Sequence, residues 1–278
     1  MTDDLEPRPD PPPWRLRRPR LRAAVGTPRP GGPAPPSDGV APEEVVPFNR
    51  IRSRASAALV ESKTGSAHAW CALPADFAAV EAARSTARDS FRSEEGFSLT
   101  FLPFVARAVA GALLEFPLLN STVAAVPGSG TGGLVVHDEV NLGFAVDLDH
   151  QGLVVPVVRD AGRLPVTSIA RAVHDLATRA RAKRLQPDEV AGVTFTITNP
   201  GAAGTWMSIP IIHRPAVAIL STDGVRRRVV ARDGALAIRP VGYLGLSYDR
   251  SVIGPTYAAG FLTRVAELLA RRDWSDEV

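Results

Sequence analysis

The sequence has little cysteine and no long apolar run, and each shortage excludes a class of protein. Cys71 is the only cysteine among 278 residues, so an internal disulfide is impossible and a reducing, cytoplasmic setting is expected. Cys71 lies in an apolar run, which predicts a buried strand residue rather than a nucleophile. No apolar stretch approaches the ~18 residues that span a membrane, so we expect no membrane partner.

The charge balance excludes a further class of protein. Charged residues make up 22% of the chain, and the formal net charge is only +3. This balance gives no reason to expect nucleic acid as a partner. No cluster of metal ligands surrounds Cys71, and we expect no metal site. The start of the chain, Thr2, Asp3 and Asp4 followed by prolines, does not resemble a signal peptide.

Residues 1–45 differ in composition from the rest. They are rich in proline and arginine and hold few large apolar side chains, so they cannot bury enough surface to fold. We expect a disordered arm over 1–45 and one folded core over 46–278. The arginines of the arm are expected to be solvated, with docking to an acidic partner as the alternative. They are Arg15, Arg17, Arg18, Arg20 and Arg22.

The core alternates between helical and strand-like patterns. A strand over 228–246 is expected to be broken by a hairpin turn at Asp233-Gly234, and Thr167 is expected to cap a helix. Strands and helices without a regular βαβ repeat predict an α+β domain, with a mixed β-sheet and flanking helices. The other predicted helices cover 51–63, 74–92, 101–115 and 255–271, and the other predicted strands cover 134–147, 153–158, 193–198 and 216–222.

The C-terminal stretch VGYLGLSYDRSVIGPTYAAGFL (241–262) carries a family resemblance. It resembles the signature of dihydrolipoyl acyltransferases, the catalytic cores of 2-oxo acid dehydrogenase complexes, which reads L-S-Y-D-H-R-x-x-D-G-x-x-x-A-x-F-L. Similar blocks occur upstream in the family's order, and the resemblance covers about 46 to 271. These blocks are IRSRASAALVESKTGSAH, SLTFLPFVARAVAGALLEFPLLNS, NLGFAVDLDHQGLVVPVVRDA and TFTITNPGAAGTWMSIPIIHRPAVAIL.

The resemblance implies a coenzyme A-dependent acyltransferase fold, shared with chloramphenicol acetyltransferase. It also implies a homotrimer or a multiple of trimers, with the active site in a channel between subunits. Coenzyme A or acyl-CoA would enter as a substrate rather than as a covalently bound cofactor. Neither Lys63 nor Lys183 lies in a hairpin motif that could carry lipoate. We therefore expect a free-standing core.

The sequence departs from the family motif where the chemistry takes place. The family histidine, which takes a proton from the acyl acceptor, is aligned with Arg250. A guanidinium stays protonated at physiological pH and offers only donors, so Arg250 cannot act as that base. The family aspartate is aligned with Gly254, and the following glycine with Pro255. We therefore expect the usual base to be missing.

Other family positions retain suitable side chains. Thr198 is aligned with a hydroxyl that hydrogen-bonds the oxyanion, although a β-branched residue in a strand is the plain alternative. Thr198 and Arg250 are the predicted catalytic residues. Asp249 is also expected to form an internal ion pair, with Arg52 as one candidate partner. Histidines 68, 137, 150, 174 and 213 are not predicted to be the base. The predicted substrate or coenzyme A channel is lined by Asn199, His213, Ser247 and Asp249.

Two functions remain open from the sequence. The first is a free-standing acyltransferase that moves an acyl group from a CoA-type thioester to a small-molecule acceptor, such as a hydroxyl in a secondary-metabolite pathway. An acceptor with its own negative charge would pair with Arg250. The alternative is a catalytically silent trimeric core that acts as a scaffold or binding protein. A weaker version of this alternative binds acyl-CoA without turnover.

Overall fold

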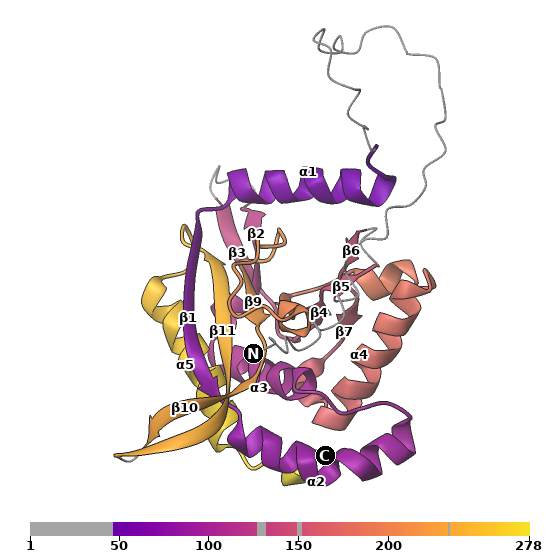
Figure 1. Ribbon diagram of the computed structural model, residues 1–278. Helices are drawn as coiled ribbons and strands as arrows, with labels where there is room; N and C mark the ends of the chain where they lie inside the picture. The colour runs from indigo at the N-terminus through magenta and orange to yellow at the C-terminus, as the bar shows by residue number, and fades with distance from the viewer. Residues whose placement is uncertain (1–46, 127–131, 149–151, 233) are drawn as a thin grey trace, which may run out of the picture. The chain divides into compact units, whose positions relative to one another are not determined.

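Strand β11 (Ala235–Asp249) organises the sheet in the computed structural model, which describes residues 47–126, 132–148, 152–232 and 234–278. Its C-terminal half pairs antiparallel with β1 (His68–Asp76) on one side and with β9 (Ala218–Thr222) on the other (Figure 1). Its N-terminal half forms a hairpin with β10 (Arg226–Arg232). The predicted arm over 1–45 lies outside the described residues.

The main sheet is mixed, as predicted. Its order is β1-β11-β9-β8-β4-β7, with β10 attached to β11. Strands β4, β8 and β9 run parallel, while the other pairs are antiparallel. Two small sheets accompany it among the described residues, β2 with β3 and β5 with β6. The remaining strands are β2 (Ser121–Ala125), β3 (Gly132–Val136), β4 (Leu142–Phe144), β5 (Val146–Asp147), β6 (Leu153–Val154), β7 (Val157–Val158) and β8 (Phe195–Thr198).

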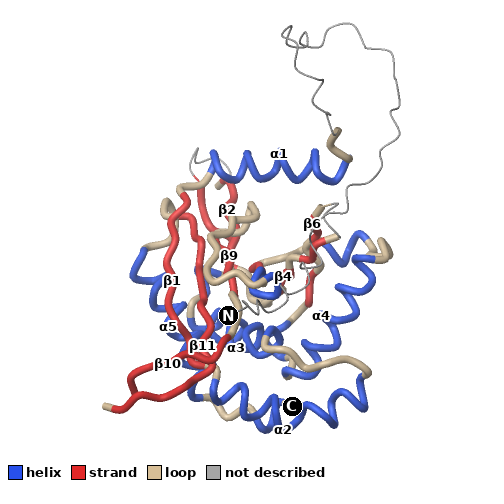
Figure 2. Tube along the Cα trace, in the orientation of Figure 1, coloured by secondary structure: helices blue, strands red, loops and turns tan. Residues whose placement is uncertain are grey.

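Helices and strands follow one another without a βαβ repeat. Figure 2 shows the helices in blue around the strands in red. This arrangement confirms the predicted α+β class. The α-helices are α1 (Arg50–Gly65), α2 (Ala78–Glu95), α3 (Leu102–Glu115), α4 (Val166–Arg181) and α5 (Pro255–Arg271). Short 3-10 helices cover Pro117–Leu119, Ala161–Arg163, Pro187–Val190, Pro200–Ala203 and Ser275–Glu277.

The core lies between one face of the sheet and helices α3 and α5. Side chains alternate along a strand, so Leu244, Leu246 and Tyr248 of β11 point to the same side and join the buried cluster. Helix α3 is buried from Pro103 to Leu113 on nearly every side, which explains its apolar sequence. Helix α5 begins with Pro255 at a first-turn position that needs no amide donor.

The opposite face of the sheet is polar but also buried. Ser247, Ser221 and Thr196 are each at most 1% exposed. Part of the loop that connects β8 to β9 lies over this face, because the Ser221 hydroxyl donates to the carbonyl oxygen of Ser208 at 3.1 Å. The sheet therefore has an apolar side that packs on helices and a polar side beneath a loop.

Two predicted boundaries were wrong because contacts with residues distant in the sequence overrode the local pattern. Pro74 does not begin a helix. It pairs with Tyr243 inside β1, an edge strand that tolerates a missing amide donor, and α2 starts later with the Asp76 carboxylate accepting from the Ala78 N–H. Helix α4 starts at Val166, so Thr167 is not its cap; the Glu277 carboxylate accepts the Val166 N–H at 3.2 Å.

The predicted long strands in the middle of the chain are divided. The stretch 134–147 contributes to β3, β4 and β5, which belong to three different sheets. The stretch 153–158 forms β6 and β7, separated by Val155 and Pro156. The other predicted helices and strands are present at nearly the expected boundaries. Gly234 has the positive φ of 78° that the predicted hairpin turn needs, while Asp233 lies outside the described residues.

None of the described helices is long and apolar enough to cross a membrane.

Replacement of Trp274 tests how strongly the C-terminal segment is tied to the core. Trp274 is 1% exposed, its ring meets Phe104 edge-on at 5.4 Å, and its Nε1 donates to the Leu269 carbonyl oxygen. We expect Trp274→Ala to lower the free energy of unfolding by about 3–5 kcal/mol in urea titrations. The control is Leu236→Ala at a side chain that is 81% exposed, with an expected change within about 0.5 kcal/mol. Equal effects of the two variants would contradict this packing.

Candidate active site

Thr198 ends β8 at the mouth of a pocket. Its strand lies between two parallel neighbours, with Thr196 opposite Gly143 of β4 and Thr198 opposite Ser221 of β9. Because both neighbours fix the strand, the end of β8 has little freedom to shift. The Thr198 side chain is half-buried, and its hydroxyl makes no hydrogen bond to another described residue.

The pocket has a volume of about 640 Å³ and a mostly apolar lining. Helix α4 supplies one wall through a stripe of side chains at helical spacing. Arg181 lies at one end of this stripe, and its guanidinium forms no ion pair with a described residue. The wall opposite comes from Phe144 to Asp147 and from Leu153. The α4 stripe consists of Ala170, Val173, His174, Ala177 and Arg181.

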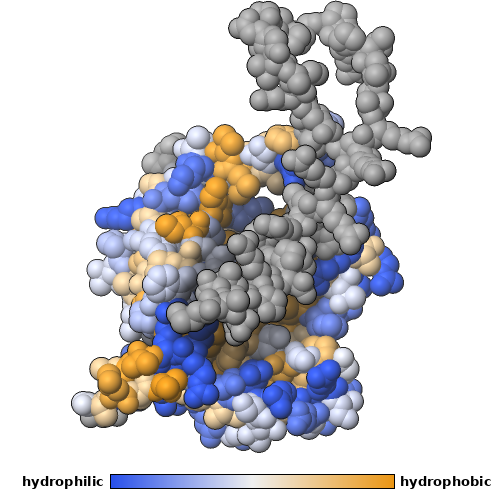
Figure 3. All heavy atoms as spheres, viewed as in Figure 1, coloured by the Kyte–Doolittle hydropathy of each residue, from blue (hydrophilic) through white to orange (hydrophobic). Residues whose placement is uncertain are grey.

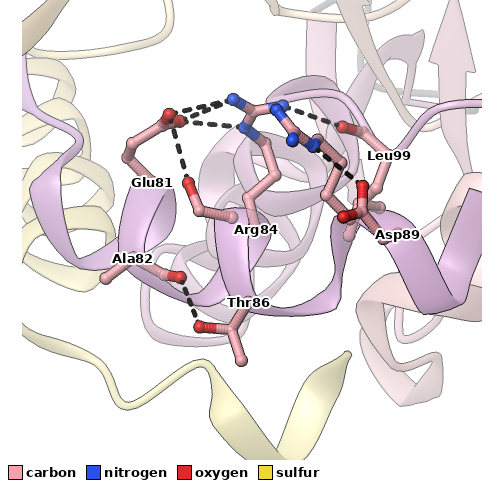
Figure 4. Close-up of polar contacts among 8 residues, drawn as sticks. Glu81, Ala82, Arg84, Thr86, Asp89 and Leu99 are labelled. Carbon is pink, nitrogen blue, oxygen red and sulfur yellow. Dashed lines mark hydrogen bonds and ion pairs between the residues drawn. The ribbon is translucent and has the colours of Figure 1, made fainter.

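The segment 97–101 forms the end of the pocket between α2 and α3, and α2 holds it in place. The Arg84 guanidinium donates hydrogen bonds to both carboxylate oxygens of Glu81 at 2.9 Å and to the Leu99 carbonyl oxygen at 3.3 Å (Figure 4). The same guanidinium lies 4.8 Å from the centre of the Phe101 ring. These contacts fix the backbone from which Phe97 and Thr100 line the pocket.

The chain beyond Thr198 is held by a close backbone contact and a buried carboxylate. A Cβ on Gly201 would lie 2.3 Å from the Gly224 nitrogen, so only glycine allows this approach. Asp223, which is buried, accepts hydrogen bonds from the hydroxyls of Thr205 at 2.6 Å and Ser208 at 3.2 Å. The loop is therefore attached to the strand end beside Thr198.

Arg250 lies in a tight turn after β11. Its backbone N–H donates to the Ala67 carbonyl oxygen at 2.8 Å, and the Asp249 N–H donates to the Val217 carbonyl oxygen at 2.8 Å. The Arg250 side chain is exposed and forms no ion pair with any residue that the structure describes. Gly254 precedes α5 with an ordinary φ of −71°, and a Cβ there would meet nothing within 4 Å.

Asp249 is 3% exposed and supports this turn. Its carboxylate accepts from the Ser251 hydroxyl at 2.6 Å, the Ser251 N–H at 3.0 Å and the Ala67 N–H at 3.2 Å. Burial alone would raise the pKa of this carboxyl, but the hydrogen bonds outweigh burial and lower the pKa. The expected ion pair with Arg52 is not formed, because these hydrogen-bond donors satisfy the carboxylate instead.

Within one chain, Thr198 and Arg250 are far apart. Thr198 pairs with Ser221, which pairs with Gly245 of β11. Arg250 lies five residues beyond Gly245, which places it roughly 16 Å further along the sheet at ~3.3 Å per residue. The structure therefore does not bring the two predicted catalytic residues together in a single copy.

The predicted channel residues occupy different environments. Asn199 is exposed and lines the Thr198 pocket, whereas His213 lines a separate pocket of about 380 Å³ with Glu61 and Arg214. Ser247 is 1% exposed on the polar face of the sheet, and its hydroxyl has no hydrogen-bond partner among the described residues. In the single chain only Asn199 shares a pocket with Thr198.

Two histidines outside the Thr198 pocket, His68 and His137, form hydrogen bonds within the fold. His68 Nε2 lies 3.1 Å from the Ile212 N–H, which donates to it, and Nδ1 lies 3.2 Å from the Ser66 carbonyl oxygen. Both ring nitrogens of His68 are therefore occupied. His137 Nε2 lies 3.1 Å from the Thr122 hydroxyl. His150 lies outside the described residues.

Sequence reasoning missed the wall that α4 provides. His174 stacks on Phe97 with ring centroids 3.9 Å apart and lines the Thr198 pocket with Arg181. The signal was present, because Ala170, Val173 and Ala177 are spaced for one helical face. The helix also packs on the core, where Val166, Ile169, Ala170, Leu176 and Ala180 are buried.

Metal and thiol chemistry find no support in the described residues. No group of three or more His, Cys, Asp and Glu side chains there is arranged to hold a metal ion. Cys71 lies in β1 as predicted but is only half-buried, and burial raises the pKa of its thiol. A raised pKa disfavours the reactive thiolate at neutral pH.

Comparison with known proteins places these features in a family context. Residues 40–274 match the family described as 2-oxoacid dehydrogenases acyltransferase (catalytic domain). A pyruvate dehydrogenase complex acetyltransferase component from Mycobacterium bovis is 38% identical over 80% of this chain. A 2-oxoglutarate dehydrogenase complex succinyltransferase component from Bartonella vinsonii is 36% identical over 82%. The matched segment spans 40% and 54% of these two relatives, about half of their length.

Solved structures agree with the sequence relatives. A dihydrolipoamide acetyltransferase from Azotobacter vinelandii superposes with a TM-score of 0.79 and 34% identity, covering 86% of this chain and 97% of the other. In that protein a serine, a histidine and an asparagine were investigated for roles in the catalytic mechanism. A probable dihydrolipoamide acetyltransferase from Listeria monocytogenes gives a TM-score of 0.77 and 32% identity, covering 83% and 97%.

Replacement of Asp249 tests the support of the turn before α5. Because the folded-state pKa of Asp249 is lowered, its contribution to stability is present above the ordinary pKa of 3.8 and is lost as the pH falls through the folded value. We expect Asp249→Asn to lower the free energy of unfolding by about 1–3 kcal/mol at pH 7. The difference should shrink below pH ~4, measured by urea titration at several pH values. A difference that does not change with pH would mean that the charge of the carboxylate plays no part.

Proposed function

Because the chain belongs to the acyltransferase family of the 2-oxoacid dehydrogenases, we propose that it transfers an acyl group from a coenzyme A thioester to a small-molecule acceptor. The observation that carries this proposal is the pocket at Thr198, where a hydroxyl that bonds to no other described residue lies at the end of a strand fixed on both sides. A hydroxyl held in this way is suited to a charge that forms only during the reaction.

The spacing of residues in the Azotobacter enzyme supports the assignment. Its serine precedes its histidine by the same number of residues that separates Thr198 from Arg250 in this chain. Its asparagine follows the histidine by the same interval that separates Arg250 from Gly254. On this basis Thr198 keeps the hydroxyl of the family site, while Arg250 and Gly254 replace the other two groups.

The Thr198 pocket fits the donor. Its long apolar wall along α4 suits the extended pantetheine arm of an acyl-CoA, and its volume of about 640 Å³ far exceeds an acetyl group. Arg181, at the far end of the α4 stripe, forms no ion pair with a described residue, and its guanidinium would pair with a phosphate of the donor. The thioester carbonyl would then lie near Thr198.

The chemistry at this carbonyl is attack by the acceptor. When the acceptor oxygen or sulfur bonds to the carbonyl carbon, negative charge develops on the carbonyl oxygen, and the Thr198 hydroxyl donates a hydrogen bond to it. The carbon–sulfur bond to coenzyme A then breaks, and the coenzyme A thiolate takes a proton from water. Arg250 cannot accept the acceptor's proton, so that proton goes to water or to a basic group of the substrate.

The distance between Thr198 and Arg250 implies that the full site needs two copies. Roughly 16 Å along one sheet is too far for both residues to act on one reacting centre, so the Arg250 side chain that meets Thr198 comes from a neighbouring copy. We therefore propose a homotrimer or a multiple of trimers. Relatives in this family include the cubic core of the pyruvate dehydrogenase multienzyme complex.

The apolar surface supports assembly. The loop before β9 exposes Trp206 at 59%, Met207 at 46% and Ile209 at 66%. The β10–β11 hairpin exposes Val229 and Ile238, which pair across the hairpin and share one face, and Figure 3 shows this hydrophobic surface at its lower left. Exposed apolar side chains that gather in this way mark surfaces that are covered in an assembly.

Replacement of Thr198 tests the proposed function. We expect Thr198→Val to lower kcat for acetyl transfer from acetyl-CoA to a thiol acceptor by about 10²–10³-fold, because the valine keeps the shape and removes the donor. The matched control is Thr196→Val on the same strand, where the hydroxyl is buried and has no partner among the described residues. The control should keep its kcat.

Equal activity of the parent and both variants would remove Thr198 from the mechanism. The assay follows the acetylated product by mass spectrometry, with dihydrolipoamide and 3-mercaptopropionate as acceptors. If the parent forms no product with either acceptor while it binds acetyl-CoA, the silent core becomes the better explanation. The observation that favours this second function is the pair Arg250 and Gly254, neither of which supplies a base.

Light scattering tests the assembly. At micromolar concentration the protein should have three times the 29.5 kDa mass of one chain, or a multiple of that value. A stable monomer at this concentration would contradict the two-copy site and, with it, the proposed role of Arg250.

A further inference from the structure

Arg250 carries a positive charge that no acidic side chain among the described residues pairs with. The neighbouring carboxylate, Asp249, is buried and accepts hydrogen bonds from the Ser251 hydroxyl, the Ser251 N–H and the Ala67 N–H. The Arg250 backbone is fixed by the Ala67 carbonyl oxygen, while its side chain is exposed. The base of this side chain is therefore held firmly, and its guanidinium is available to another molecule.

A second guanidinium lies close to the same turn. Arg214 donates from Nη1 to the Gly65 carbonyl oxygen, and the Arg250 N–H donates to the carbonyl oxygen of Ala67. These two acceptor residues are separated by one residue, so their Cα atoms are at most ~7 Å apart. Lys63 precedes them in the last turn of α1. This part of the chain therefore has three cationic side chains, those of Arg250, Arg214 and Lys63. One acidic side chain, Glu61, lines the adjoining pocket with Arg214.

From this arrangement we infer that the acyl acceptor carries a carboxylate, which Arg250 binds. The inference rests on the proposed function, in which Arg250 of one copy faces the Thr198 pocket of the next. A guanidinium offers a planar fork of donors that matches the two oxygens of a carboxylate, and such paired hydrogen bonds fix orientation as well as position. Arg250 thus positions the acceptor at the place where a basic residue would otherwise remove its proton.

A thiol acceptor can react without a protein base, because water can take its proton. The acceptor S–H loses its proton to water, and the thiolate attacks the carbonyl carbon of the acyl-CoA. A new carbon–sulfur bond forms, the bond to the coenzyme A sulfur breaks, and the departing thiolate takes a proton from water. A bound carboxylate holds the thiolate at the reacting carbon for this attack, and proximity of this kind raises the rate.

The test uses two acceptors that differ only in charge, 3-mercaptopropionate and its neutral amide 3-mercaptopropionamide. With acetyl-CoA as the donor, the parent should show at least about 10-fold higher kcat/KM for the carboxylate. Arg250→Gln should remove this preference, because it raises KM for the carboxylate at least about 10-fold more than KM for the amide. Arg250→Lys, which keeps the charge but loses the fork, should retain part of the preference. The preference is expected to survive in Arg271→Gln, which removes an exposed arginine near the end of α5.

Equilibrium binding separates this inference from the proposed function. Titration of the full-length protein with 3-mercaptopropionate, followed by NMR, should show saturable binding that Arg250→Gln weakens at least about 10-fold and Arg271→Gln preserves. Such binding without any acetyl transfer would support a carboxylate site at Arg250 and overturn the proposed function. Transfer to both acceptors with equal kcat/KM, or binding that Arg250→Gln does not change, would overturn the inference and leave acyl transfer intact.

Discussion

The pairing of β11 with β9 is the interaction on which the rest of the structure depends. Through it the register of one central strand sets the positions of both candidate catalytic residues, because Thr198 is level with Ser221 and Gly245 while Arg250 follows the far end of β11. The same strand supports β1 and the exposed hairpin with β10. Shifting this register by one residue would turn Leu244 and Leu246 out of the core and bring Gly245 in.

Much of this fold could be predicted from the sequence where the local pattern and the tertiary environment agree. Helix α3 is apolar on every side and is buried, and α5 begins at the expected Pro255. Prediction failed where partners distant in the sequence decide. Pro74 belongs to a strand because β11 lies beside it, and 134–147 is divided because its parts pair with different strands. These partners leave no trace in the local pattern.

The candidate site shows the same division between local and long-range information. Thr198, Arg250 and Gly254 could be singled out because each lies in a contiguous motif. The α4 wall could not, because the pocket joins segments near residues 100, 145, 175 and 200, and only the folded chain brings them together. The turn at Arg250 is held by Asp249 and backbone groups rather than by the Arg250 side chain. A change of residue at 250 is therefore expected to leave the backbone in place.

The loop that covers the polar face of the sheet exposes apolar side chains on its outer side, and this exposure has a consequence during synthesis. A single chain presents Trp206, Met207 and Ile209 to the solvent. Encounters between such chains lead either to ordered assembly or to aggregation, and the balance depends on how fast the chains accumulate. Slow expression at low temperature favours productive encounters, whereas rapid overproduction favours precipitation.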